Sequence, residues 1–166
     1  TSANLATQAL VSANMPAGSV VNSTVGTYAT NADLTTAIPA DDTIPQNTEG
    51  TQIISVSHTP ASTTNKLRIR FTGQAAGAGA GYQIAAAIFK NSTADAIAAT
   101  AVNGGASGEM QPLSIQCEYT PGSTSAQTIA VRVGAGSGTI RMNGGPSTRA
   151  YGGASAACLI VEEIKA

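Results

Sequence analysis

Apolar and polar residues alternate over short segments along most of the chain. In 67–71, leucine, isoleucine and phenylalanine take every second position, with arginines between them. Segment 129–133 repeats this pattern with isoleucine and two valines. A period of two is typical of a β-strand with one face on a core. The pattern predicts ten strands, at 20–30, 34–38, 52–59, 66–73, 82–90, 97–102, 112–119, 127–134, 138–142 and 157–164.

Glycine, proline, serine and asparagine gather between the predicted strands. Thr-Pro-Ala-Ser at 59–62 and Thr-Pro-Gly-Ser at 120–123 are turn signals. Recurring strands without helices between them indicate an antiparallel β-sandwich, and eight to ten strands favour a jelly-roll-like one. Three glycine-rich stretches, 73–81, 104–108 and 144–153, are predicted as loops. Such loops at the ends of a sandwich are common places for binding sites.

The first fifteen residues have a different period. Leucines and alanines recur every three or four positions over 5–15, which predicts a short helix that Pro-Ala-Gly at 16–18 ends. A helix this short needs partners. Either it lies on its own domain, or it is the end of a stalk in which copies pack through Leu5 and Leu10. The predicted division is a helical stalk or linker at 1–17 and a β-sandwich at 18–166.

The chain carries little charge. Charged residues are 10%, aromatic residues 4%, and the net charge is −1. Without clustered Lys and Arg the chain is not expected to bind nucleic acid, because neutralising phosphates needs such clusters. No apolar run approaches about 20 residues, so membrane insertion is not expected either. A nearly neutral surface is poorly protected from self-association, which favours an assembling protein.

Few residues could carry chemistry. His58 is the only histidine, and we expect it at the surface or at a strand edge, because a turn follows it. Cys117 and Cys158 are either two buried free thiols or a disulfide. Neither cysteine has a second ligand at a metal-binding spacing. The sequence therefore predicts no metal, no cofactor and no enzyme activity.

Acidic residues are densest at Asp41 and Asp42, with Asp33 and Glu49 near them. Their spacing matches no calcium loop, and Asp commonly serves turns. Nothing fixes two carboxylates at the separation that glycoside hydrolysis needs. No phosphate-binding loop motif is present either.

The basic residues and the loop tyrosines are the remaining candidates. We expect cross-strand or inter-chain ion pairs between arginines and glutamates, among Arg68, Arg70, Arg132, Arg141, Arg149, Glu118, Glu162 and Glu163. Arg149 and Tyr151 share a glycine-rich loop, where an aromatic ring beside a cation suits a sugar, with an anionic glycan as one candidate for Arg149. Tyr82 borders another such loop. Each tyrosine is either a ligand contact or an anchor for its loop.

Several segments resemble phage and prophage tail-fibre-like proteins. Met-Pro-Ala-Gly-Ser-Val-Val at 15–21 resembles the segment that introduces their C-terminal domain. The run 38–50, from Ile-Pro-Ala-Asp-Asp to Glu-Gly, resembles a loop of related phage structural proteins, and the strand, Thr-Pro turn and 65–70 segment follow as they do there. The end, 159–164, resembles their closing strand. The resemblance implies a virion fibre or spike with a terminal β-sandwich, usually trimeric, that contacts the host surface or holds a structural place. It transfers no binding residue.

The leading hypothesis is the tip domain of a phage fibre or spike. It forms a homotrimer, contacts other virion proteins and attaches to a host-surface glycan or protein through its glycine-rich loops. The alternative is a capsid decoration or cement protein that makes structural contacts only. A glycan depolymerase is the least favoured hypothesis, since such enzymes show paired carboxylates and aromatics along a groove. The expected location is the virion.

Overall fold

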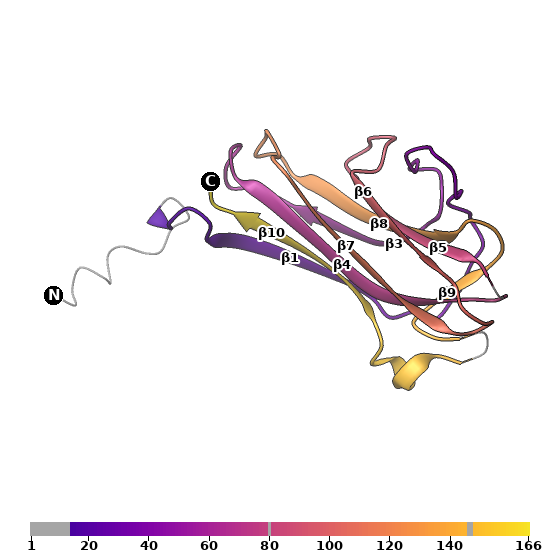
Figure 1. Cartoon of the computed structure of the whole chain (residues 1–166). Coiled ribbons are helices and arrows are strands. Elements are labelled where there is room, and N and C mark those ends of the chain that lie inside the picture. Colours follow the sequence, from indigo (N-terminus) through magenta and orange to yellow (C-terminus); the bar gives the residue numbers. More distant parts are fainter. Residues whose placement is uncertain (1–13, 80, 146–147) are drawn as a thin grey trace.

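A computed structural model describes residues 14–79, 81–145 and 148–166. Over these residues the chain forms ten strands in two antiparallel sheets that pack face to face (Figure 1). The elements in chain order are β1 (Val20–Tyr28), β2 (Asp33–Leu34), β3 (Thr51–His58), β4 (Lys66–Gly77), β5 (Gln83–Lys90), β6 (Ala98–Asn103), β7 (Met110–Tyr119), β8 (Gln127–Ala135), β9 (Ile140–Met142), the 3₁₀ turn η3 (Ala150–Gly153) and β10 (Ala157–Ile164).

The strand order is that of a jelly roll. One sheet runs β1-β10-β4-β7, with short β9 pairing β4 beyond the end of β10 and β2 outside β9. The other runs β3-β8-β5-β6. With β2 and β9 set aside, the eight longer strands numbered consecutively give the orders 1-8-3-6 and 2-7-4-5. This interleaving of first and last strands defines a double-sheet jelly roll and confirms the predicted all-β sandwich.

The core lies between the two sheets and uses the inward phase of each strand. On β4, Leu67, Ile69 and Phe71 are fully buried, as their alternation with arginines predicted. On β8, Ile129, Val131 and Val133 meet them from the other sheet. Burying each such side chain contributes about 1.5–3 kcal/mol. Aliphatic residues can therefore stabilise the core although aromatic residues are few.

A second apolar cluster lies on the outer face of the β3-β8-β5-β6 sheet, over β5. Ile38 packs there against Phe89 and the alanines of β5. The segment before Ile38 lies flat on β8 because Gly134 has no Cβ; one placed there would lie 2.6 Å from the Thr36 carbonyl oxygen. The predicted strand at 34–38 is therefore shorter, pairing only as β2, and its last residue serves this cluster instead.

Strand β4 extends further than predicted. Segment 73–81 was expected to be a glycine-rich loop, but β4 continues to Gly77 and pairs with β7 on one side and β9 on the other. The glycine at 73 suits this packing, since a Cβ there would lie 3.0 Å from Ala157 Cβ and 3.1 Å from Met142 Cε. Small residues here allow close packing and do not break the strand.

The molecule has two distinct ends. At one end, the Gly18 amide donates to the Lys165 carbonyl at 2.9 Å, so the start of β1 lies beside the end of β10 (Figure 1). The turns 59–65 and 120–126 lie at this same end by register. The loops after β4, β6 and β8 lie at the opposite end. We call these the stalk end and the glycine-rich end.

The predicted N-terminal helix at 5–15, including Leu5 and Leu10, lies outside the described residues except for its last two positions. Its stalk role therefore stays a prediction, as does the boundary between 1–17 and 18–166. No helix in the described ranges has the length and apolar character needed to cross a bilayer.

Candidate functional site

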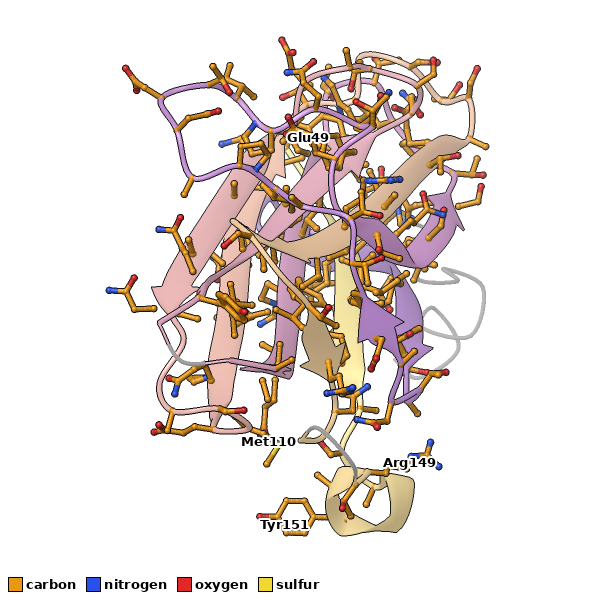
Figure 2. All side chains as sticks on the ribbon, turned by 90° about the vertical axis from the view of Figure 1, so that its right-hand side faces the viewer. Glu49, Met110, Arg149 and Tyr151 are labelled. Carbon is orange, nitrogen blue, oxygen red and sulfur yellow. The ribbon has the colours of Figure 1, made fainter. Side chains whose placement is uncertain are left out.

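Loops from distant parts of the sequence meet at the glycine-rich end. The Gly108 amide donates to the Gly77 carbonyl at 2.9 Å, which joins the β6–β7 loop to the end of β4. The Ala78 amide donates to the Thr139 carbonyl at 2.9 Å and adds the β8–β9 loop. Backbone hydrogen bonds thus join three loops into one surface. Figure 2 views the molecule from this side.

Tyr82 is half-buried within this surface. Its ring lies against Gly79 and Gly138, where a Cβ on Gly138 would be 2.7 Å from Tyr82 Cζ. The Gly104 amide also donates to the Tyr82 carbonyl at 2.5 Å. The glycines leave room for this ring, and Tyr82 packs between the loops as an anchor does. Its ligand contact stays a prediction.

Arg149 folds back on its own protein. Its Nη2 donates to the Ala29 carbonyl at 2.5 Å, beyond the end of β1. The guanidinium also covers Gly153, where a Cβ would lie 2.6 Å from Cζ of Arg149. This side chain fastens η3 to the sandwich.

Tyr151 projects into solvent from η3. Its side chain is 79% exposed, the largest such value among the exposed large apolar residues of the described chain. Its backbone is left-handed, with φ 48° and ψ 39°. That conformation costs a non-glycine residue about 1–2 kcal/mol. Figure 2 shows Arg149 and Tyr151 on opposite sides of η3, so the two predicted partners do not converge on one ligand position.

Asn143 is a residue whose importance the sequence did not reveal. It is fully buried with φ 60°. Its Nδ2 donates to the carbonyls of Tyr28 at 2.7 Å and Thr30 at 3.2 Å. The backbone carbonyl of Asn143 accepts from the Ala150 amide at 2.9 Å. Asn143 therefore joins η3 to the end of β1. Its place in Asn-Gly-Gly-Pro marked a turn but not this network.

Two arginines make the predicted cross-strand pairs with glutamates, and a third, Arg141, pairs with an aspartate that was not among the expected partners. Arg68 Nε lies 2.7 Å from Glu118 on β7, and Arg70 Nη2 lies 2.9 Å from Glu162 on β10. Arg141 Nη2 donates to Asp33 Oδ2 at 2.9 Å between β9 and β2.

Arg132 does not follow the prediction, because its guanidinium donates to the carbonyls of Glu49 at 2.6 Å and Gly50 at 2.8 Å. It thereby holds the end of the 36–50 segment on β8.

Three of the four acidic residues predicted near one another, Asp33, Glu49 and Asp41, have separate partners. Asp33 pairs with Arg141, and Glu49 accepts from the Gln46 amide at 2.9 Å. Asp41 accepts from the amide of Thr43 at 2.9 Å and from its hydroxyl, and these hydrogen bonds lower the pKa of Asp41. Asp41 thus serves a turn. Within the described ranges, no three His, Cys, Asp or Glu side chains gather as a metal site would require.

A buried polar cluster lies at the stalk end and corrects two expectations. His58 was expected at the surface, yet it is fully buried, with Nδ1 2.9 Å from the Thr24 hydroxyl and Nε2 3.8 Å from Glu163. Glu163 was expected to pair with an arginine but faces inward. It accepts from the Ala61 amide at 2.9 Å and from Asn65 Nδ2 at 2.7 Å. The turn after β3 folds over these side chains and covers them.

This cluster predicts a pH dependence of stability. Burial lowers the pKa of His58 below its ordinary 6.5, and the nearby Glu163 carboxylate offsets this only in part. The unfolded chain therefore takes up the proton first as pH falls. We expect the free energy of unfolding to be level above about pH 6.5 and to fall below it, by at most about 1.4 kcal/mol per pH unit.

Urea unfolding between about pH 7.5 and about pH 5.5 measures this slope. His58→Gln should flatten it. A slope that is unchanged in His58→Gln would assign it to another group.

The two cysteines are free, and both are half-buried. Cys117 lies opposite inward-facing Ile69, whereas Cys158 lies opposite outward-facing Thr72. The two side chains therefore point to opposite faces of one sheet with β4 between them. This excludes the disulfide alternative and leaves two free thiols, less buried than expected.

No protein-family model matches the chain, and no curated protein sequence matches it. Solved structures with similar folds include dimeric latent PorU from Porphyromonas gingivalis, with 9% identity and a TM-score of 0.40 over 91% of this chain and 14% of that chain. The infectious bursal disease virus Gx strain structure has 15% identity and a TM-score of 0.42 over 89% of this chain and 38% of that chain.

The enzymatically active domain of tailspike protein 4 from bacteriophage CBA120 has 14% identity and a TM-score of 0.29, over 75% of this chain and 19% of that chain. The chain thus spans well under two thirds of each of these three structures. Similarity at this level assigns no function.

Proposed function

We propose that this chain is a virion structural protein: the tip domain of a phage fibre or spike. It forms a homotrimer and attaches to the host-cell surface through its glycine-rich end. It acts by binding and not by catalysis, and its other partners are virion proteins. The resemblance of segments 15–21, 38–50 and 159–164 to tail-fibre-like proteins supports this proposal.

The polarity of the domain is the observation that carries the proposal. Residues 18 and 165 are hydrogen-bonded at the stalk end, so the chain leading into β1 enters there. The glycine-rich loops lie at the far end of the strands (Figure 1). A domain mounted by its stalk end presents these loops outward, where loops on a rigid scaffold bind partners.

Strand β1 provides a surface for self-association. Val20 and Val25 are 46% and 57% exposed on this edge strand, and Val25 lies opposite half-buried Ile160 on β10. Exposed valines on an edge strand are a liability in a monomer unless another chain covers them. Three copies that associate through this face would bury the valines and keep the three glycine-rich ends together. Binding through several linked weak sites raises the overall avidity.

Selective masking of the two ends tests the attachment proposal. Ser137→Cys places a thiol in the β8–β9 loop at the glycine-rich end, and Thr124→Cys places one in the β7–β8 turn at the stalk end. Each variant is coupled to a maleimide polymer and incubated with bacterial strains of differing surface polysaccharide. We expect saturable binding that the polymer at 137 abolishes and the polymer at 124 leaves intact.

The unsubstituted chain with the same reagent controls for Cys117 and Cys158. Equal loss from both labels would contradict attachment through the glycine-rich end. Absence of binding to every strain would favour the capsid-decoration alternative.

A further inference from the structure

The ring of Tyr151 is held out from the molecule at a cost in stability. The side chain is 79% exposed, so burial within the chain does not offset this cost. Its left-handed backbone is one that glycine adopts freely and tyrosine does not, and Gly152 and Gly153 after it also have positive φ. Strained residues of this kind concentrate at ligand contacts.

The segment beneath Tyr151 is rigidly tied to the sandwich. Arg149 donates to the Ala29 carbonyl and covers Gly153, and the Ala150 amide donates to buried Asn143. These contacts fix the residues on both sides of Tyr151 to the end of β1. A ring on such a support loses little freedom on binding, which is the condition for a preorganised contact.

The charged groups at this end are already engaged. Arg141 pairs with Asp33, Glu109 accepts from the Ala106 amide at 3.0 Å, and Arg149 is committed to the Ala29 carbonyl. Residues 80, 146 and 147 are alanine, proline and serine and add no charge. The Arg149 guanidinium keeps its charge, but it lies on the opposite side of η3 from the Tyr151 ring (Figure 2). A ligand packed on the ring is therefore not placed against this cation, and an uncharged ligand needs none.

From these observations we propose that Tyr151 is the contact residue for an uncharged saccharide, whose C–H face packs on the tyrosine ring, and that Arg149 is a positioning residue. Pyranose rings offer such an apolar face, and the electron-rich face of an aromatic ring attracts the C–H groups. This inference rests on the proposed attachment function and names its ligand class. It replaces the expectation that Arg149 itself binds an anionic glycan.

Nuclear magnetic resonance of the full chain tests the ligand class. The probes are the methyl glycosides of glucose, galactose and mannose, each beside its uronic acid, at millimolar concentrations. We expect at least one neutral glycoside to shift the Tyr151 ring signals saturably. The affinity of its uronate should be lower by a factor of about ten or more. If none of the three neutral glycosides shifts the Tyr151 ring signals, or if a uronate binds as tightly as its neutral glycoside, the proposal is overturned.

Variants separate the ring from its support. Tyr151→Phe should keep the response, and Tyr151→Ala should abolish it. Tyr151→Gly should also abolish it while raising the melting temperature, because glycine relieves the backbone strain. Arg149→Ala should weaken binding and broaden the Tyr151 ring signals, a loss of order that a direct ligand contact would not cause. A Tyr151→Gly chain that melts lower, or an Arg149→Ala chain with unchanged ring signals, would contradict the support described here.

Cell binding of the same variants distinguishes this proposal from attachment itself. One outcome is that cells bind the chain, Tyr151→Ala abolishes this binding, and no sugar shifts the Tyr151 ring signals. The attachment function then stands and the proposed ligand class is wrong. If a neutral sugar binds at Tyr151 but no cell binds the chain, the site stands and the attachment function fails.

Discussion

Replacing Glu163 with alanine is expected to lower the free energy of unfolding by about 3–5 kcal/mol. The Glu163 carboxylate is fully buried and accepts from the Ala61 and Ser62 amides and from Asn65 Nδ2. Its removal leaves these donors without an acceptor, and each buried unsatisfied group costs about 1–3 kcal/mol. Against a total of about 5–15 kcal/mol for a typical domain, this loss is severe.

The neighbouring glutamate is a matched control. Glu162 is on the same strand but faces outward, where it pairs with partly exposed Arg70 at 2.9 Å. Glu162→Ala should cost about 1 kcal/mol or less, because exposed ion pairs contribute little. Urea unfolding at neutral pH measures both variants. Equal losses would mean that Glu163 is not the acceptor that holds the 59–65 turn.

The second large effect is expected from Val25→Asp, which should convert the proposed trimer to monomers. Val25 is 57% exposed on the outer face of β1, where the proposed self-association face lies. A carboxylate there would have to be desolvated against its own copies in the trimer, and nearby like charges would repel. The monomer should remain folded because the side chain points away from the core.

Ser57→Asp provides the comparison for this variant. It adds the same charge to an exposed position of β3, on the outer face of the other sheet. We expect Ser57→Asp to leave the proposed trimer intact. Sedimentation velocity of both variants at several concentrations gives the answer. If Val25→Asp sediments as the unsubstituted chain does, the β1 face is not the interface.

The sequence predicts the strands well because their signal is local. Alternation at 67–71 and 129–133 identifies both partners of the core, and all ten predicted strands have a counterpart in the structure. The errors arise where small residues leave the pattern weak. Segment 73–77 looked like a glycine-rich loop, yet it pairs with β7 on one side and, at 75–77, with β9 on the other. Its small residues suit close packing, since a Cβ at 73 would lie 3.0 Å from Ala157 Cβ and 3.1 Å from Met142 Cε.

The polar cluster at the stalk end was missed for a different reason. On β10, Glu163 alternates with Leu159 and Val161, which are buried. The sequence pattern therefore already placed its side chain on the inward face of the strand. The partners of Glu163 were not present in the pattern, because Ala61 and Asn65 lie about a hundred residues away in the sequence. No local pattern places the turn after β3 over the end of β10.

The candidate site divides in the same way. The exposed aromatic at Tyr151 and the glycines around it were visible as a loop signal. The direction of Arg149 was not, since it depends on the Ala29 carbonyl at the far side of the chain. Nor was the support from Asn143, which joins β1 to η3. Sequence reasoning therefore placed Tyr151 on a loop without deciding whether its ring is exposed, and it paired the ring with Arg149, which lies on the other side of η3.

The proposed function depends most on the association of three copies through their β1 faces, which presents the glycine-rich ends together. The molar mass of the full chain in solution, from sedimentation equilibrium or native mass spectrometry, tests this association most directly. We expect three times the mass of one chain, persisting on dilution to low micromolar concentration. A stable monomer at the highest accessible concentration would contradict it.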